Sequence, residues 1–246
     1  MPNIGNIIIL RYGEGRQKKI HEVFTTHHMI NNLFRFIVNP YIPTWRKTSL
    51  KEFIRLLFVY VLLTIPLIIL SGFVAKALRV THVEFTKGST LMILYGVFVG
   101  PILEEIIFRS WLKWTKRNIY ILIATFLLFV GLSFFHHQFQ QIYIMLFLLL
   151  LVVILTYLLK NIKVEPFINN HFKYFYWGSS IVFGLVHASN FIGNIWYLIG
   201  FSFILASPQI IGGFILGYIR MNNGLRYSIL FHILVNSYLL LSLLHK

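Results

Sequence analysis

The chain has 246 residues, of which 57% are hydrophobic, 17% are aromatic and only 12% are charged. A soluble domain carries about one quarter charged residues, so this composition, with a mean hydropathy of +0.74, is typical of a polytopic membrane protein. The absence of cysteine excludes disulfides, thiolate metal sites and cysteine nucleophiles. The net charge of +15 comes with no nucleic-acid-binding motif, so we expect an anionic lipid bilayer as a partner and no nucleic acid.

Residues 1–52 are predicted to form a basic cytoplasmic extension. Their first 30 residues lack the apolar core and the small-residue cleavage site of a signal peptide. An amphipathic interfacial helix is expected near residues 30–38, before the turn at Pro40 and Pro43. This segment could also enter the bilayer and add an eighth hydrophobic element.

Hydropathy predicts seven membrane spans in the rest of the chain, which we interpret as one domain over residues 53–244. The spans are expected at about 53–75, 89–111, 119–135, 142–159, 175–192, 196–219 and 226–244. The expected fold is therefore an all-α polytopic membrane protein with about seven transmembrane helices. With the N-terminus in the cytoplasm, all but four of the 22 Lys and Arg residues lie at the inner side of a cytoplasmic (inner) membrane.

Two adjacent glutamates, Glu104 and Glu105, interrupt the second span in the stretch PILEEIIFRSWLKW. A carboxylate at membrane depth costs several kcal/mol unless it has a partner or a function. Arg109 lies four residues after Glu105 on the same helix face, so these two residues are expected to form an ion pair. Glu104 is rotated by about 100° from Glu105 and is expected to stay available for chemistry.

Two further spans carry polar side chains at a comparable depth. His187 lies within the fifth span, and the seventh carries His232 and Asn236 four residues apart on one face. The predicted orientation puts all three in the cytoplasmic half of the helix bundle, with Glu104. A lone histidine or asparagine in a membrane helix is more typical of a hydrogen bond between helices than of catalysis, but a cluster of ionisable groups inside a membrane indicates a functional site.

The spacings EExxxR, FxxxH and HxxxN occur in this order on separate spans, at Glu104–Arg109, Phe183–His187 and His232–Asn236. Together they resemble the CPBP family of CAAX proteases and bacteriocin-processing proteins, also called the Abi family. The resemblance covers about residues 53–244. It implies an intramembrane (metallo)endopeptidase that cuts peptide or membrane-protein substrates in a cavity open to the cytoplasm. The implied site residues are Glu104, Glu105, Arg109, His187, His232 and Asn236.

These residue types are sufficient for peptide hydrolysis. Glu104 would act as the general base that activates a water molecule, and His187 would position that water. His232 and Asn236 would donate hydrogen bonds to the oxyanion. If zinc is present, His187, His232 and Glu104 would form an open His₂Glu site, but the HExxH spacing is absent and the metal requirement stays open.

Two alternatives belong to other functional classes. In a proton-coupled transporter, intramembrane Glu and His side chains would relay protons. The polar residues cluster in one leaflet and no inverted repeat is visible, which argues against a carrier. A non-catalytic immunity or binding protein could keep the same residues as a vestigial site. Peptide cleavage by the purified protein would distinguish a peptidase from both alternatives.

Overall fold

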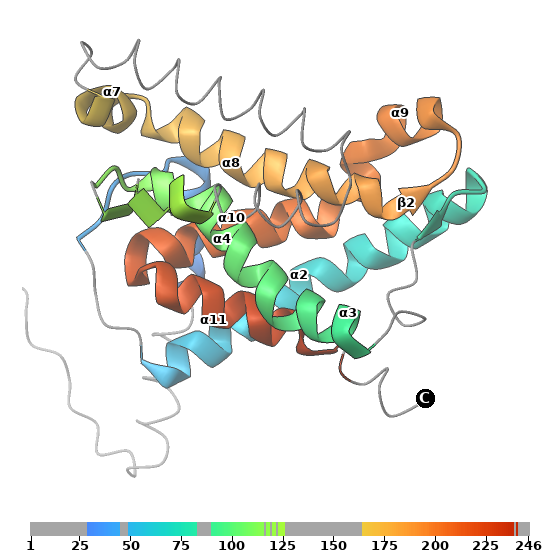
Figure 1. Ribbon diagram of the computed structural model, residues 1–246, viewed down its shortest axis with the longest axis horizontal. Helices are drawn as coiled ribbons and strands as arrows, with labels where there is room; N and C mark the ends of the chain where they lie inside the picture. The colour runs from blue at the N-terminus through green and yellow to red at the C-terminus, as the bar shows by residue number, and fades with distance from the viewer. Residues whose placement is uncertain are drawn as a thin grey trace, which may run out of the picture.

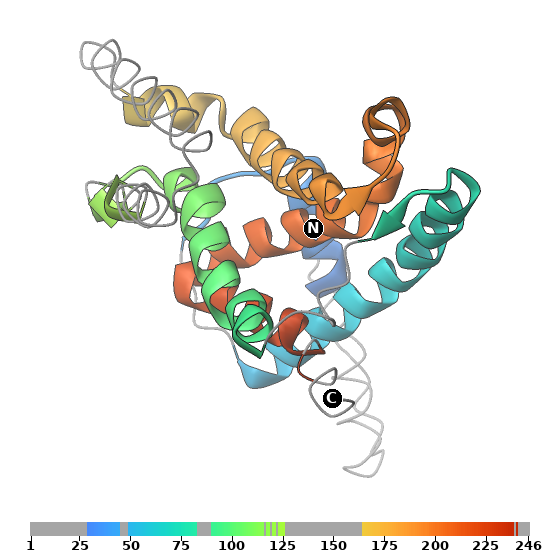
Figure 2. The same ribbon diagram turned by 45° about the vertical axis from the view of Figure 1, so that its right-hand side comes forward.

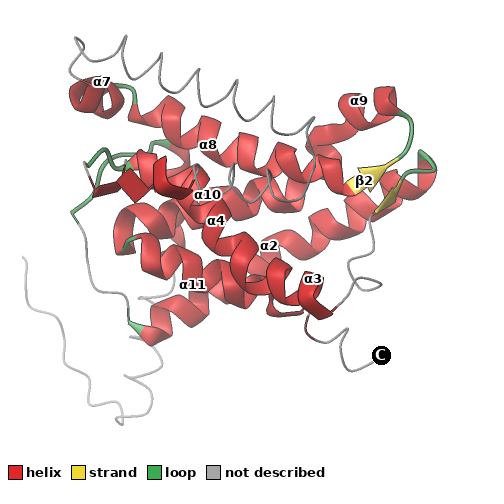
Figure 3. Cartoon of the chain, viewed as in Figure 1, coloured by secondary structure: helices red, strands yellow, loops and turns green. Residues whose placement is uncertain are grey.

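Figure 1 shows the computed structural model of the protein, which describes residues 29–44, 49–82, 90–115, 117–118, 120–121, 123–125, 164–238 and 240. This part of the chain is mostly helical, so the predicted all-α class is confirmed. Its one described sheet is a short antiparallel pair, β1 (Thr81–His82) with β2 (Phe191–Ile192), drawn in yellow in Figure 3.

The helices follow one another with breaks where helical geometry changes. In chain order they are Met29–Val38, α2 (Leu50–Ala77), α3 (Thr90–Leu94), the π-helix η2 (Tyr95–Val99), α4 (Gly100–Arg109), the 3₁₀-helix η3 (Ser110–Leu112), α7 (Val164–Asn170), α8 (Phe172–Val186), the 3₁₀-helix η5 (His187–Asn190), α9 (Ile195–Leu205), α10 (Ser207–Asn223) and α11 (Leu225–Asn236). α3, η2 and α4 are contiguous, so the predicted second span is one helical segment with a π-turn in it.

The prediction of seven transmembrane helices is not supported. Among the described residues, only α2 is by itself long and apolar enough to cross a bilayer. α9 and α10 would make a second span if taken together, although they are bent by 45° where they meet. The predicted spans 119–135 and 142–159 lie mostly outside the described residues.

Local breaks explain why the hydropathy prediction overestimated the spans. α8 has 15 residues and α11 has 12, whereas a straight crossing of the hydrocarbon core needs about 20. The apolar run of the fifth span continues to residue 192, but α8 ends at Val186. The chain then turns through η5 into β2, so His187 lies at the C-terminus of a helix and not in mid-span.

α10 is the central helix of the described structure and packs against α2, α8, α9 and α11 (Figure 2). It approaches α8 closely at two of its own glycines, which are four residues apart. A Cβ at Gly213 would lie 2.5 Å from the Ser180 carbonyl oxygen, and one at Gly217 would lie 2.7 Å from the Tyr176 ring. Small residues at this spacing allow the backbones of membrane helices to approach closely.

The helix Met29–Val38 coincides with the helix expected near residues 30–38. Its buried residues are Met29, Leu33 and Phe36, which follow the spacing of one helical face. The Phe36 ring makes edge contacts with Tyr176 of α8 and Tyr218 of α10. This helix therefore joins the same hydrophobic core as the rest of the bundle.

Gly213→Ala is expected to destabilise the protein, because the new methyl group would meet a backbone carbonyl that cannot rotate away. Overpacking of this kind costs about 1–3 kcal/mol, and a thermal unfolding curve in detergent would measure it. Gly178→Ala on α8 is the matched control, since a Cβ there meets nothing within 4 Å and alanine is the better helix former. Equal midpoints for the two variants would contradict the close α8–α10 approach.

Candidate active site

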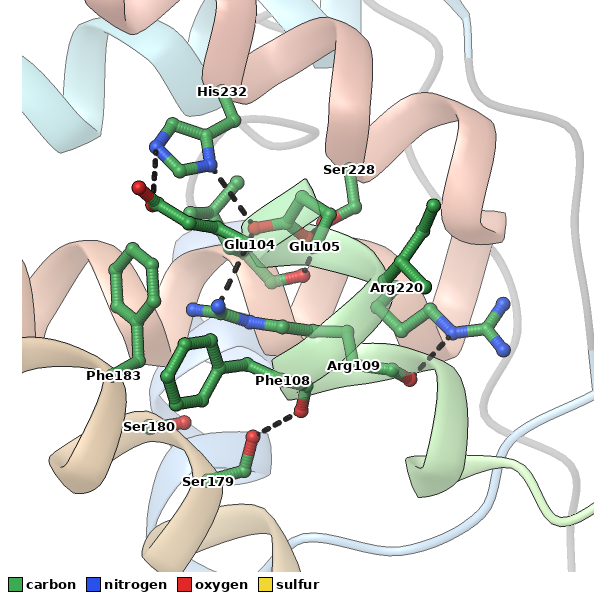
Figure 4. A network of polar contacts seen from close by, with 12 residues as sticks. Glu104, Glu105, Phe108, Arg109, Ser179, Ser180, Phe183, Arg220, Ser228 and His232 are labelled. Carbon is green, nitrogen blue, oxygen red and sulfur yellow. Dashed lines mark hydrogen bonds and ion pairs between the residues drawn. The ribbon is translucent and has the colours of Figure 1, made fainter. Parts of the chain in front are cut away.

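α4 carries Glu105 and Arg109 into the contact with α8 and α11 (Figure 4). Both residues are completely buried, and Arg109 Nη1 lies 3.5 Å from Glu105 Oε1. The ion pair predicted from the four-residue spacing is therefore present. It brings opposite charges together where neither can reach water.

α11 supplies the remaining partners of the Glu105 carboxylate. Ser228 Oγ donates to Glu105 Oε2, and His232 Nδ1 lies 3.2 Å from Glu105 Oε1. Ser228 and His232 are four residues apart and so share one face of α11. Glu105 thus connects α4 to α11 through both of its oxygens.

Aromatic rings surround the Arg109 guanidinium. Among the described residues, none supplies a hydrogen-bond partner to its three nitrogens, but its Cζ lies 3.8 Å from the centre of the Phe183 ring. A desolvated cation over an aromatic face can gain about 2 kcal/mol. The Phe183 ring also makes an edge contact with the His232 ring, at 5.6 Å between centroids. Phe183, the first residue of FxxxH, therefore links the arginine of the first motif to the histidine of the third.

Glu104 has a different environment from Glu105. Its side chain is 32% exposed, and its Oε2 atom is buried without a hydrogen-bond partner in the part of the chain that the structure describes. His187 Nε2 and His232 Nε2 each lie 3.7 Å from this atom. α4, η5 and α11 therefore bring together the carboxylate and the two imidazoles that sequence analysis assigned to one site.

The hydrogen bond at Nδ1 of each imidazole determines whether its Nε2 atom presents a hydrogen or a lone pair to Glu104. His187 Nδ1 lies 2.8 Å from the Phe183 carbonyl oxygen, which only accepts, so this nitrogen carries the proton. His232 Nδ1 faces the Glu105 carboxylate and carries a proton for the same reason. In the neutral rings, both Nε2 lone pairs then point toward Glu104 Oε2. A water molecule can donate hydrogen bonds to two of these three acceptors at a time.

The same three atoms can be compared with a zinc site. Metal-binding histidines hold their other nitrogen against a carbonyl or carboxylate, as His187 and His232 do. Ligand atoms of tetrahedral zinc lie about 3.4 Å apart, whereas the separations from Glu104 Oε2 are 3.7 Å. Within the described residues, no three His, Asp or Glu side chains converge closely enough to hold a metal ion. The donor types therefore fit zinc, and their present spacing does not.

Asn236 lies one turn after His232 on α11, as expected from HxxxN. Its Nδ2 donates to the Gly96 carbonyl oxygen of η2, at 3.0 Å. This bond ties α11 to the π-helix that leads into α4. The amide is therefore engaged with the backbone beside the site, and its predicted role toward an oxyanion stays a prediction.

Arg220 on α10 caps the C-terminal end of α4. It is almost fully buried, and it donates from Nε to the Arg109 carbonyl at 3.0 Å and from Nη2 to the Ser110 carbonyl at 3.4 Å. A cation at the C-terminus of a helix satisfies free carbonyls and complements the helix dipole. The Arg220 charge also reaches Lys113, the residue after η3. Partial burial of Lys113 and this nearby charge lower the pKa of its ammonium group.

Sequence analysis missed two residues that organise the site. Ser228 lies four residues before His232, so a search for polar side chains along that face of α11 could have found it. Arg220 had no such signal, because its partners are backbone carbonyls more than 100 residues away.

Comparison of the chain with protein-family models, with curated proteins and with solved structures found no match. The family resemblance therefore depends on the three sequence motifs. Residues of all three motifs, Glu104, His187 and His232 among them, meet at one place in the fold.

Proposed function

We propose that the protein is a membrane endopeptidase of the CPBP type, which hydrolyses a peptide bond near the cytoplasmic face of the inner membrane. The main support for this proposal is the position of one atom, Oε2 of Glu104. This atom is buried, has no hydrogen-bond partner among the described residues and lies 3.7 Å from the Nε2 atoms of His187 and His232. A water molecule at this point could donate one hydrogen bond to His187 Nε2 and give up its other proton to the carboxylate.

In the proposed mechanism, Glu104 accepts a proton from this water as it attacks the carbonyl carbon of the scissile bond. His187, held by its Nδ1–H bond to the Phe183 carbonyl, orients the water through its Nε2 lone pair. Glu104 then returns the proton to the nitrogen of the leaving amine, which balances the reaction.

The oxyanion needs hydrogen-bond donors. His232 Nε2 can donate only if the ring carries two protons, because its Nδ1–H already faces Glu105. The flanking carboxylates of Glu104 and Glu105 are the partners that such an imidazolium requires. The ring of His232 would therefore stabilise the oxyanion with a charged hydrogen bond.

The outward surface of α2 supports the membrane location in this proposal. Only 22% of its most apolar window is buried, whereas a core helix of a soluble protein would be mostly buried. Phe58 and Phe73 on α2 are 68% and 72% exposed, and Trp196 on α9 is 76% exposed. Large apolar side chains on a continuous outer face need a non-aqueous partner, and we infer that this partner is lipid.

The test is incubation of the full chain, purified in detergent, with a pool of synthetic peptides of mixed sequence. Mass spectrometry should detect new peptide termini with the wild-type protein and none with Glu104→Ala. A transporter or a non-catalytic binding protein would leave the pool intact in both samples. Comparing membrane-protein C-termini between a wild-type strain and a Glu104→Ala strain would then identify natural substrates.

Chelation is expected to leave the cleavage rate unchanged, and active protein should carry far less than one metal ion per chain. His232→Ala should then lower the rate by about 100- to 1,000-fold, as the loss of one oxyanion donor does. Elemental analysis and the rate before and after chelation are the measurements. Stoichiometric zinc that leaves with the activity and restores it on return would contradict the metal-free mechanism.

A further inference from the structure

The π-helix η2 and the proline that follows it leave the Gly96 carbonyl open to a donor from another helix. In a π-helix each N–H bonds to the carbonyl five residues earlier, and Gly100 N–H donates to the Tyr95 carbonyl in this way. If the π-pattern continued by one residue, the Gly96 carbonyl would receive the N–H of residue 101. That residue is Pro101, which has no N–H.

Asn236 fills this gap from another helix. Its Nδ2 donates to the Gly96 carbonyl oxygen at 3.0 Å. The bond satisfies this carbonyl and so stabilises the π-turn itself. Because Asn236 lies one turn after His232, the bond also fixes the helix of His232 against the segment that leads to Glu104.

The π-turn determines where the two glutamates point. One extra residue in a helical turn rotates everything after it by about 100° relative to everything before it. If η2 relaxed to α-helical geometry, α4 would have to rotate or shift against α3. Glu104 would then lose its position between His187 and His232, which come from other helices.

We propose that Asn236 is a positioning residue, which acts by satisfying the Gly96 carbonyl and holding the π-turn that aims Glu104. This inference rests on the proposed peptidase function. It differs from the role expected from the sequence, in which the Asn236 amide donates directly to the oxyanion. In the positioning role, any donor to the Gly96 carbonyl can replace the amide.

Pro101→Ala provides such a donor, because the new N–H of residue 101 can bond to the Gly96 carbonyl. Asn236→Ala alone should lower kcat by about 10- to 100-fold with little change in KM, since displacing a catalytic group by 1 Å costs up to this much. The double variant Pro101→Ala/Asn236→Ala should recover most of the lost kcat. Pro66→Ala on α2 is the matched control, and combining it with Asn236→Ala should restore nothing.

Thermal unfolding of the same variants makes a test that does not depend on catalysis. Asn236→Ala should lower the unfolding midpoint, and Pro101→Ala should restore it in the double variant. If the wild type cleaves no peptide, the proposed function fails, and the midpoints alone support or overturn the role of Asn236 in holding the π-turn. A double variant that regains its midpoint but keeps the kcat of Asn236→Ala would overturn the inference, because the amide would then act on the substrate. An unchanged midpoint in Asn236→Ala would overturn it as well.

Discussion

Glu104→Gln is expected to abolish peptide cleavage and to leave the protein at least as stable as the wild type. The loss should be about 1,000-fold or more in kcat, near the upper range for removing a general base. Stability should not fall, because Glu104 Oε2 has no hydrogen-bond partner to lose among the described residues. The glutamine amide would instead offer N–H donors to the lone pairs of His187 and His232. Cleavage rates and thermal midpoints in detergent are the measurements.

Glu104→Asp tests the position of the same carboxylate. It keeps the base but withdraws it by one methylene group from the point between the two imidazoles, so a loss of about 100-fold is expected. Glu165→Gln is the control, since Glu165 is an exposed residue of α7 outside the site. If Glu104→Gln kept wild-type activity, Glu104 would not be the base and the proposed mechanism would be wrong.

The part of the site that depends on helix periodicity could be predicted from the sequence. The spacing of Glu105 and Arg109 predicted an ion pair, and one is present. The contrast between a buried Glu105 and an available Glu104 followed from their 100° separation on the helix. The meeting of Glu104 with His187 and His232 was expected from similar depths on three spans, and the structure brings them within 3.7 Å.

The lengths of the helices and the remaining contacts of the site depended on information that hydropathy and residue spacing do not contain. A hydropathy window adds up apolar residues and cannot detect that α8 ends before His187, so it predicted a longer span than the helix provides. The acceptor of Asn236 could not be predicted, because it exists only where a π-turn meets Pro101. The cation–π contact between Arg109 and Phe183 likewise requires the packing of α4 against α8. Unpaired backbone groups and ring faces become visible only in three dimensions.

Glu105→Gln is expected to damage the fold far more than Glu104→Gln, although the two residues are neighbours. It removes the negative charge beside Arg109, whose guanidinium is completely buried and finds no hydrogen-bond partner within the described ranges of the chain. Breaking a buried pair by removing one partner costs about 3–5 kcal/mol, because it leaves the other charge uncompensated. For a chain of this size, that corresponds to a fall of on the order of 10 °C in the unfolding midpoint. Membrane accumulation should fall with it.

The double variant Glu105→Gln/Arg109→Met separates this explanation from a simple need for the Glu105 side chain. Methionine removes the uncompensated charge and keeps an apolar chain against the Phe183 ring, and buried ion pairs can often be replaced in this way without loss of stability. The midpoint should therefore recover toward the wild-type value. Catalysis should stay impaired, because the carboxylate that holds His232 Nδ1 is still absent. If the double variant were no more stable than Glu105→Gln, the unpaired arginine would not be the cause of the damage.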